Sequence, residues 1–329
     1  MILLTGATGI VGSHVLIELL KKGEKVRVLK RAGSSTQAID QLLKYHQLSK
    51  NSFEIVDGDI NDLVSLSDAS EDCESIYHCA AMVSFNPADA DKLHKANVVG
   101  TKNVVDTCLA KSIKTLAYVS STAAIGGQLI NGMQNESSEW VSDKGKSDYT
   151  LSKRYAEMEA WRGAQEGLNV AIVNPAVIIG PGKWGQSSTT LFQSAKKGLK
   201  VYSSGSNGFV DARDIAEILI DLVEKKVFSE RFLLVGEHLP FKGFFERLSP
   251  RFGNSGPKLK MPKAPVLWFA GVLNHFEKLG VCLPGITSEN MKSAYRNVHY
   301  DTAKIKALGY EFRPLEESFD YSLKVQEMN

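Results

Sequence analysis

The N-terminal segment places glycines at a fixed spacing directly after a short apolar run. Met1-Ile2-Leu3-Leu4 is short enough for a buried strand, Thr5-Gly6-Ala7-Thr8-Gly9-Ile10-Val11-Gly12 follows at once, and an apolar helical pattern opens at Val15. Glycines between a strand and a helix let the backbone turn sharply and approach a pyrophosphate, which the free N–H groups at the helix N-terminus hold. The segment therefore predicts a dinucleotide-binding unit. Its expected contacts are Gly6, Thr8, Gly9, Ile10 and Gly12.

Short apolar runs alternate with helical patterns through the first half of the chain, which is typical of a parallel sheet covered on both faces. The helical patterns include Asp91–Lys111, a segment that starts near Tyr149, and Ala212–Lys225, after which Arg231–Val235 is expected to return to the sheet. The other predicted strands are Ile2–Leu4, Lys25–Leu29, Phe53–Val56, Ser75–His78, Thr115–Val119 and Val170–Val173. The predicted fold class is α/β, a Rossmann doubly wound parallel sheet with a smaller, mostly C-terminal lobe.

Two stretches interrupt this alternation. Residues 175–209 are rich in glycine and serine, and residues 237–284 are rich in proline. Insertions at the carboxyl ends of strands are where open α/β sheets bind their ligands. We therefore expect two interleaved domains: a nucleotide-binding domain of residues 1–174 plus 212–236, and a substrate-binding lobe of residues 175–211 plus 237–329.

The composition argues against several classes of function. A net charge of +2 over 329 residues lacks the basic excess of a nucleic-acid-binding protein. The cysteines and histidines have no metal-ligand spacing, so we expect reduced cysteines and no metal site. Ala264–Leu273 is the longest apolar stretch and is too short to span a bilayer, and a strand starting at Met1 leaves no place for a signal peptide. We expect a cytoplasmic protein without stable membrane insertion.

The end of the second predicted strand indicates which dinucleotide is preferred. The residue about 20 positions after the glycines faces the adenosine ribose, and a carboxylate there selects NAD. This chain has Lys30 and Arg31 instead, and no acid lies between Glu24 and Asp40. Arg31 can bind a 2′-phosphate through two hydrogen bonds, and Lys30 can add a contact. The pattern favours NADP, with NAD as the second choice; the alternative is a solvated basic strand end.

Asp59 and Ile60 follow the third predicted strand. An acid at this point can accept a hydrogen bond from the adenine amino group, while the aliphatic neighbour covers the ring. A helix-capping role for Asp59 explains the residue equally well on local grounds.

Tyr149 and Lys153 carry the strongest chemical signal. Positions i and i+4 of a helix lie on one face, so the spacing brings an ammonium close to a phenol. A nearby positive charge favours the phenolate, so we expect Lys153 to lower the pKa of Tyr149 and to suit it for proton transfer near neutral pH. The alternative is an ordinary exposed helix pair.

Hydroxyl side chains gather at the end of the fifth predicted strand. Tyr118-Val119 is followed by Ser120-Ser121-Thr122. Hydroxyls at the carboxyl edge of the sheet can hydrogen-bond a reacting oxygen. Their alternative role is to form a turn or to cap a helix.

These motifs, taken together, resemble those of the extended short-chain dehydrogenase/reductases of the NAD(P)-dependent epimerase/dehydratase superfamily, and the similarity runs nearly end to end. The matching segments are Thr5 to Gly12, His78-Cys79-Ala80-Ala81, Asn97-Val98-Val99-Gly100-Thr101, Ser120-Ser121-Thr122, Tyr149 to Lys153, Asn174-Pro175, Gly180-Pro181-Gly182, Tyr300-Asp301-Thr302-Ala303-Lys304 and Leu308-Gly309-Tyr310.

The resemblance implies roles for individual residues. Tyr149 would be the general acid/base and Lys153 would hold the nicotinamide ribose. Thr122 would be the hydroxyl partner of the reacting oxygen, with Ser121 as a substitute, and Asn97 would support the site. The remaining expected cofactor contacts are Ala80, Ala81, Pro175 and Val177. The resemblance also implies a homodimer built on helices near Asp91–Lys111 and Tyr149.

Departures from the family pattern narrow the reaction. Thr122 is followed by Ala123-Ala124, where similar sugar-nucleotide dehydratases have an Asp-Glu pair, so a dehydratase is disfavoured. The diphosphate-binding arginine of nucleotide-sugar enzymes is also missing before Phe209, although Arg213 lies nearby. The closest likeness is to dihydroflavonol reductases and hydroxysteroid dehydrogenases. We therefore expect NADP(H)-dependent reduction of a small carbonyl substrate. A nucleotide-sugar epimerase and a non-catalytic redox sensor are the alternatives.

The substrate lobe is expected to use residues 126–146, 184–202 and the helical pattern Val266–Leu279. Trp268, Phe269 and Phe276 in this pattern suggest an apolar or ring-containing substrate, and core packing under a lid explains them equally well. Lys258, Lys260 and Lys263 precede the pattern. Contact with a membrane surface is one interpretation of this cluster; a solvated loop leading into a packed lid helix is favoured over it.

Overall fold

The computed structural model describes residues 1–127, 129–278 and 287–328. Its centre is a seven-stranded parallel sheet with the strand order β10-β6-β5-β4-β1-β2-β3. The strands are β1 (Ile2–Thr5), β2 (Val26–Lys30), β3 (Glu54–Asp57), β4 (Ser75–His78), β5 (Thr115–Val119), β6 (Asn169–Pro175) and β10 (Glu230–Leu234). Every predicted strand is confirmed to within two residues, and so are the fold class and the return of β10 to the sheet. The order reverses between β1 and β4, where open sheets of this type bind ligands.

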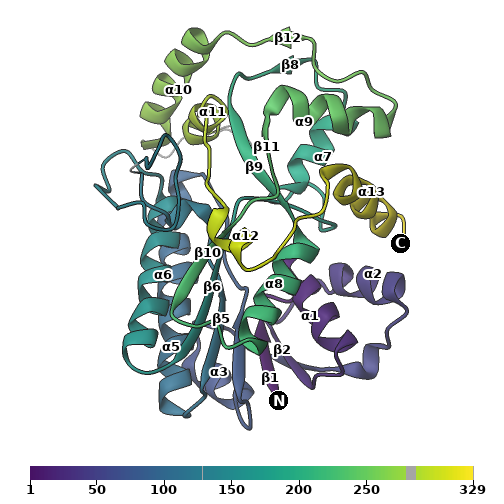
Figure 1. Ribbon diagram of the computed structural model, residues 1–329. Helices are drawn as coiled ribbons and strands as arrows, with labels where there is room; N and C mark the ends of the chain where they lie inside the picture. Colours follow the sequence, from purple (N-terminus) through teal and green to yellow (C-terminus); the bar gives the residue numbers. More distant parts are fainter. Residues whose placement is uncertain (128, 279–286, 329) are drawn as a thin grey trace.

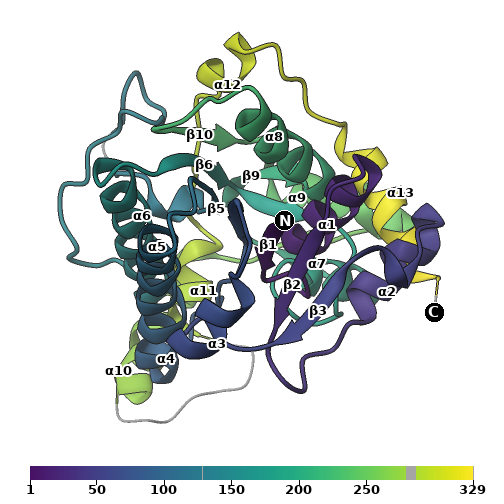
Figure 2. The same cartoon turned by 90° about the horizontal axis from the view of Figure 1, so that it is seen from below.

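Helices cover both faces of this sheet (Figures 1 and 2). One face carries α1 (Ile10–Lys21), α2 (Gln37–His46) and α8 (Ala212–Glu224), and the other carries α3 (Leu63–Ala69), α5 (Gly100–Ala110) and α6 (Asp148–Gln165). Successive side chains of a strand point to opposite faces. Leu4 of β1 accordingly packs into the first core and Leu3 into the second. Burial on both faces explains why the strands read as continuous apolar runs.

The helix predicted at Asp91–Lys111 is present, but it is not uniform. It consists of α4 (Ala90–Leu93), a π-helical segment (His94–Val99) and α5. π-helical turns are rare and often occur at functional sites, because the extra residue redirects side chains. Asn97 lies in this segment.

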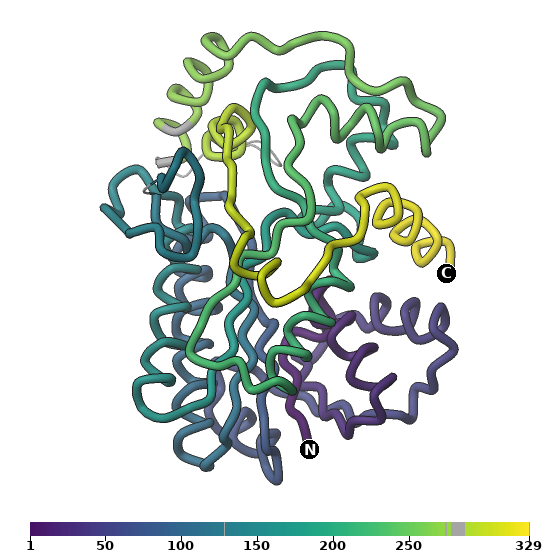
Figure 3. Tube along the Cα trace, viewed as in Figure 1, coloured from purple at the N-terminus to yellow at the C-terminus, as the bar shows by residue number. Residues whose placement is uncertain are grey.

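The elements outside the large sheet form their own layers above it (Figures 1 and 3). A three-stranded sheet joins β7 (Val177–Ile179), β9 (Ser206–Asp211) and β11 (Glu237–Pro240), and a short parallel pair joins β8 (Val201–Tyr202) to β12 (Leu259–Lys260). Their core includes Phe209 stacked on Phe244, with ring centroids 4.5 Å apart. The accompanying helices are α7 (Thr189–Lys196), α9 (Phe241–Leu248), α10 (Lys263–Lys278), α11 (Ser288–Ser293), α12 (Ala303–Ala307) and α13 (Leu315–Gln326). The two-domain division stays a prediction.

Helix α10 corresponds to the helical pattern predicted at Val266–Leu279; Leu279 itself lies outside the described residues. Three of its aromatic side chains are exposed: Trp268 by 72%, Phe276 by 48% and Phe269 by 43%. Core packing under a lid, one explanation of these residues, is therefore wrong for this structure. Neighbouring Ala270 and Leu273 supply the buried contacts instead.

Candidate active site

The turn after β1 is built for close approach of backbone to backbone. Gly6 has φ +74°, and a Cβ atom there would lie 2.4 Å from the amide nitrogen of Ala80. A Cβ atom on Gly12 would lie 2.2 Å from the carbonyl oxygen of Gly6. Only glycine fits at either position, because these contacts are with main-chain atoms that have no room to move. The tight turn brings the N-terminus of α1 to the sheet edge, where its free N–H groups can hold an anion.

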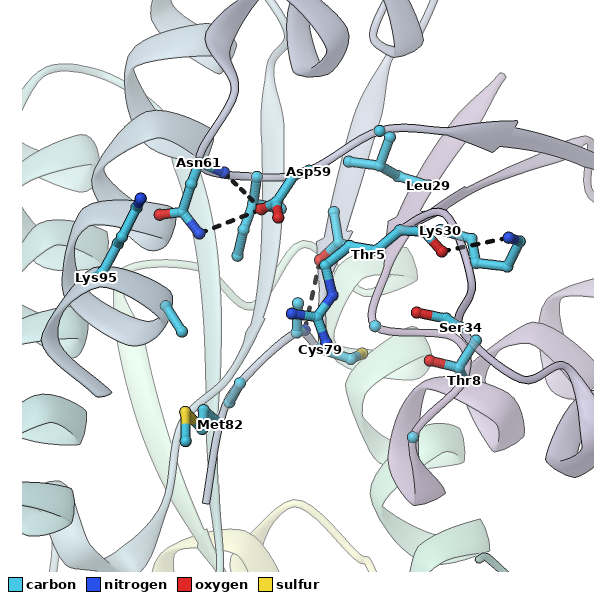
Figure 4. A pocket seen from close by; sticks show the side chains of 18 of the residues that line it. Thr5, Thr8, Leu29, Lys30, Ser34, Asp59, Asn61, Cys79, Met82 and Lys95 are labelled. Atoms are coloured by element: carbon cyan, nitrogen blue, oxygen red, sulfur yellow. Dashed lines mark hydrogen bonds between the residues drawn. The ribbon is translucent and has the colours of Figure 1, made fainter. Parts of the chain in front are cut away.

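A cavity of about 770 Å³ opens at this edge, between the glycine turn and the ends of β2, β3 and β4 (Figure 4). Nine of the predicted cofactor contacts line it: Gly6, Thr8, Gly9, Lys30, Arg31, Asp59, Ile60, Ala80 and Ala81. Ile10, Gly12, Lys153, Pro175 and Val177 are not part of the lining. The volume lies within the range of small-molecule and cofactor sites. Backbone N–H groups at one end and cations along one side suit a dinucleotide, so the residues present fit the cofactor that the glycine pattern predicts.

The two basic residues at the end of β2 differ in their surroundings. The Lys30 Nζ donates to the carbonyl oxygen of Arg31 at 3.3 Å (Figure 4). It also donates to Asp57 Oδ1 at 2.9 Å, so its charge is already compensated. Arg31 lines the cavity and, within the part of the chain that the structure describes, takes part in no ion pair. Ser34 joins the lining beside it. Arg31 is thus the cation at this end of the cavity that can bind a phosphate.

Asn61 is a cavity residue that the sequence analysis missed. Its backbone N and its Nδ2 both donate to Asp59 Oδ1, at 2.9 and 3.1 Å (Figure 4). This bond fixes the orientation of the amide, and the buried Asn61 Oδ1 is left without a partner. Buried polar atoms are nearly always hydrogen-bonded, so an unpartnered acceptor in a cavity indicates a ligand donor. Asp59 and Asn61 together offer acceptors for an amino group such as that of adenine.

Lys95 is a second cavity residue that no sequence pattern singled out. It reaches the cavity from the π-helical segment (Figure 4). Its position depends on how that helix packs against the end of β4, which the local sequence does not reveal.

Asn97 ties the end of β4 to the catalytic helix. Its Nδ2 donates to the carbonyl oxygen of Met82 and to Ser152 Oγ, both at 2.9 Å, and its Oδ1 accepts from the Met82 amide at 2.7 Å. The side chain is almost wholly buried. Met82 lines the cavity directly after Ala80 and Ala81. Asn97 therefore joins the cavity wall to α6; its supporting role in catalysis stays a prediction.

Tyr149 and Lys153 lie in the first turns of α6, whose N-terminus is capped by Ser147. The Tyr149 ring packs edge-on against Phe85, with centroids 5.4 Å apart. The buried Lys153 Nζ donates to the carbonyl oxygen of Val119 at 3.1 Å and to the Tyr118 hydroxyl at 3.3 Å. Two of the interactions of Lys153 are thus with β5 rather than with solvent.

The pKa of Tyr149 is shifted in the direction opposite to the one expected from its spacing to Lys153. Burial raises the pKa of Tyr149, and a hydrogen bond with Ser121 opposes this shift. Burial also lowers the pKa of Lys153 to about 8, against the opposing charge of Glu157. Burial thus moves the two pKa values in opposite directions, and the charge of Lys153 is not among the causes of the Tyr149 shift. Tyr149 is a protonated phenol at neutral pH.

The two candidate hydroxyls have different partners. The Ser121 side chain lowers the pKa of Tyr149, and its Oγ accepts from the amide of Ala123 at 3.1 Å, which caps the short 3-10 turn that follows. Thr122 lowers the pKa of Tyr300 instead. The roles of Thr122 and Ser121 at the reacting oxygen stay predictions.

A buried ion pair lies one helical turn beyond Lys153, and the sequence analysis did not find it. Glu157 Oε1 accepts from Arg231 Nη1 at 2.8 Å. Its Oε2 accepts from Ser120 Oγ at 2.5 Å and from Asn174 Nδ2 at 2.6 Å. Glu157 has no exposed surface, so its charge acts in a medium of low dielectric constant. It raises the pKa of Lys153 and fixes the ends of β5 and β6 beside the site.

The cysteines, possible metal ligands and possible membrane spans were also considered in the sequence analysis. Cys73, Cys79 and Cys108 are free thiols, and Cys282 lies outside the described residues. Within the described ranges, no three histidine, cysteine or acidic side chains come together as metal ligands. Across the same ranges, every helix is too short or too polar to cross a membrane.

The cavity and the Tyr149 helix together define a Rossmann-fold oxidoreductase that uses a nicotinamide dinucleotide. The sequence profile of the NAD dependent epimerase/dehydratase family matches residues 2–236, and the chain belongs to this family.

Three similar proteins illustrate the range of this family. Sterol demethylase protein B of Methylococcus capsulatus is 32% identical over 79% of this chain and 77% of its own length. A putative dihydroflavonol 4-reductase of Synechocystis is 30% identical over 93% of this chain and 88% of its own length. The crystal structure of gox2253 superposes with a TM-score of 0.83 and 26% identity, and the match covers 99% of this chain and 98% of that one.

Proposed function

We propose that this protein is an NADP(H)-dependent reductase that converts the carbonyl group of a small, apolar substrate to an alcohol. The observation that carries the proposal is that Asn97, through hydrogen bonds to Met82 and Ser152, joins the wall of the nucleotide cavity to the helix that carries Tyr149. A phenol that is protonated at neutral pH is poised to donate a proton, as the reduction of a carbonyl requires.

The proposal assigns a role to each residue, partly from its position and partly from the family resemblance. When bound, the nicotinamide cofactor supplies a hydride to the carbonyl carbon. Arg31 binds the 2′-phosphate, and Lys153 holds the nicotinamide ribose. Tyr149 donates its proton to the carbonyl oxygen, while the Ser121 hydroxyl hydrogen-bonds the same oxygen and stabilises the charge that develops on it.

Apolar side chains next to Tyr149 support an apolar substrate. Phe85 packs against its ring, Met82 lines the adjoining cavity wall, and Val83 between them is exposed. Exposed apolar side chains beside a reacting group favour an uncharged substrate whose own apolar surface can cover them.

The surroundings of Arg213 weigh against a nucleotide-sugar substrate. Its guanidinium pairs with Asp211 at 2.6 Å and with Glu317 at 3.0 Å, and it stacks 4.1 Å from the centre of the Tyr321 ring. An arginine held in this way is not free to bind a diphosphate. The name of the Synechocystis relative, a putative reductase, also supports carbonyl reduction.

The experiment is to follow NADPH oxidation with a panel of apolar aldehydes, aromatic ketones and cyclic ketones, in parallel with UDP-hexose epimerisation. The proposal expects turnover of at least one carbonyl class and none of the nucleotide sugars. Epimerisation without carbonyl reduction would contradict it. Tight nucleotide binding with no turnover of any substrate would favour the redox sensor.

The homodimer is part of the same proposal. The exposed Tyr155 and Met158 on α6 offer apolar contact area on a helix that the family resemblance places at the interface. Light scattering should give the mass of two chains; the mass of one chain would remove the dimer.

A further inference from the structure

Helix α10 lies at the upper edge of the molecule (Figure 1), and several of its large apolar side chains are exposed. Trp268 is 72% exposed, and Leu259 of the neighbouring β12 is 65% exposed. Phe269 and Phe276 lie on the same helix and are also exposed. Together these four side chains and the lysines described below form what we call the α10 surface. Exposed aromatic residues this close together are unusual on a monomeric protein.

The exposure follows from the way the helix is anchored. Ala270, Leu273 and Glu277 recur at helical spacing and are buried, so this face packs against the protein. Glu277 fixes the helix to α11 by accepting from the backbone N of Ser288 at 2.9 Å and from its Oγ at 2.6 Å. Trp268 and Phe276 point away from this face. The helix is thus apolar on its outer side as well as on its inner side, a pattern typical of helices that are covered by something else.

Lysines from two distant parts of the chain gather at the β8–β12 pair, which leads into α10. The pairing of β8 with β12 brings Lys200 next to Lys258, whose amide donates to the Lys200 carbonyl at 3.1 Å. Lys260 and Lys263 continue the cluster toward α10. All four are exposed, and in the described ranges none of them forms an ion pair. The sequence contains no acidic residue between Glu246 and Glu277.

We propose that the α10 surface binds the protein to anionic lipid membranes. A helix that lies in the plane of the interface inserts aromatic side chains at the boundary of headgroups and acyl chains, while adjacent lysines contact acidic headgroups. The exposed Trp268, Phe269 and Phe276 beside four uncompensated lysines supply both parts of this arrangement. The 16-residue helix is too short to span a bilayer, so it lies on the surface.

A lipid surface explains the α10 surface better than a second protein does. A partner that covers the apolar residues must itself be apolar. The lysines require that this partner also carries negative charge over an extended area. A bilayer containing acidic lipids has both properties. The proposal rests on this surface alone and does not depend on the reaction at Tyr149, so either can fail without the other.

The first experiment is flotation of the full-length protein with vesicles of phosphatidylcholine mixed with phosphatidylglycerol, compared with vesicles of phosphatidylcholine alone. We expect binding to the mixed vesicles that weakens as salt is added. Absence of binding to the mixed vesicles would overturn the proposal. A dimer in solution that Trp268→Ser converts to a monomer would also overturn it, because the α10 surface would then be a protein interface.

Variants locate the contact. Trp268→Ser is expected to weaken vesicle binding by roughly tenfold or more, because the buried indole area is lost. Each of Lys258→Gln and Lys260→Gln should weaken it roughly fivefold, the equivalent of about 1 kcal/mol per lysine near an acidic surface. Matched controls at the opposite end of the molecule are Val64→Ser, an exposed apolar residue of α3, and Lys114→Gln, an exposed lysine before β5. Equal effects of the control and test variants would overturn the proposal.

A fluorescence measurement distinguishes a lost membrane contact from a loss of binding caused by misfolding. Brominated lipids should quench the fluorescence of Trp268 in the bound protein. Trp268→Phe keeps an aromatic group, so we expect it to bind the vesicles while this quenching is lost. Unchanged quenching in Trp268→Phe would show that another face meets the membrane.

Discussion

The two ends of the candidate active site are shaped by different physical means. At the glycine turn the contacts come from main-chain atoms, and the shape is set by the absence of Cβ atoms at Gly6 and Gly12. At the α6 end the shape is set by buried polar side chains, with Lys153 and Glu157 one turn apart in the helix and both nearly or fully buried. The first end is therefore sensitive to added volume, and the second to changed charge.

A chain of hydrogen bonds joins the two ends. Thr101 Oγ1 donates to the Asn97 carbonyl at 2.6 Å, so its oxygen accepts from His78 Nε2 at 3.0 Å. His78 Nδ1 then accepts from Thr5 Oγ1 at 2.7 Å, directly before the glycine turn. Burial lowers the pKa of His78 to about 3, so the ring stays neutral and can accept on one nitrogen while it donates on the other.

The largest effect is expected from Tyr149→Phe, which removes the proton donor and leaves the glycine turn untouched. Loss of a general acid costs about 10²- to 10⁴-fold in rate. We expect kcat to fall by this factor while NADPH binding, followed by calorimetry, stays within error of the wild type. A variant that lost both turnover and binding would show that the two ends are not separable.

Gly12→Ala tests the glycine turn, because it adds one methyl group and changes no charge. The added methyl group would lie 2.2 Å from the Gly6 carbonyl oxygen, so the turn must shift. Overpacking of this kind costs about 1–3 kcal/mol, which corresponds to roughly tenfold to hundredfold weaker nucleotide binding. Gly243→Ala is the matched control, because α9 has room for a Cβ atom at that position. Equal affinities of the two variants for NADPH would mean that the turn does not touch the cofactor.

Arg31→Ala tests the contact with the 2′-phosphate independently of the other cofactor contacts. A hydrogen bond to a charged group contributes about 1.5–3 kcal/mol, so NADPH affinity should fall by roughly tenfold or more while NADH affinity is unchanged. Lys30→Ala is the comparison variant, and a smaller effect is expected because Lys30 is already paired with Asp57. If Lys30→Ala weakened NADPH binding more than Arg31→Ala, the assignment of the phosphate contact would be reversed.

The smallest effect is expected from Glu157→Gln, measured as a pH shift. Lys153 has a pKa of about 8, and the charge of Glu157 raises it. Activity that needs protonated Lys153 is present below this pKa and is lost as the pH rises through it. Removing the carboxylate charge should therefore move the alkaline limb of the kcat/KM profile to lower pH.

Two comparisons keep the pH experiment specific to charge. Glu159→Gln is the matched control on the same helix, because Glu159 is paired with Arg162. Thermal unfolding of both variants measures the separate cost of leaving Arg231 without its partner, which is about 3–5 kcal/mol for a broken buried pair. A shift of the limb to higher pH in Glu157→Gln would contradict the account.

The sequence predicts those structural features that are determined by residues close together along the chain. The apolar runs of the large sheet, the glycine turn and the spacing of Tyr149 to Lys153 are all local patterns, and the structure has the predicted strands and turn where they were expected. The pairing of Glu157 with Arg231 joins residues 74 positions apart, so no local pattern reveals it. The unpartnered oxygen of Asn61 likewise emerges only when the cavity is assembled.

Burial accounts for the two expectations that were wrong. The spacing of Tyr149 to Lys153 predicts an amine that lowers the pKa of the phenol, but desolvation raises the pKa of Tyr149, and the Lys153 Nζ donates to β5 instead. The aromatic residues of α10 have the spacing of a packed helix, and only the structure shows that their side is uncovered. The spacing of residues shows which of them share a face of a helix, but it does not show whether that face packs against the protein or is exposed.

The most direct test of the central claim is a calorimetric titration of the nucleotide-free protein with NADPH and NADH in parallel. An NADP(H)-dependent reductase that reads the 2′-phosphate through Arg31 should bind NADPH at least roughly tenfold more tightly than NADH. NADH binding as tight as that of NADPH would contradict this account and would make nucleotide sugars the first substrates to test.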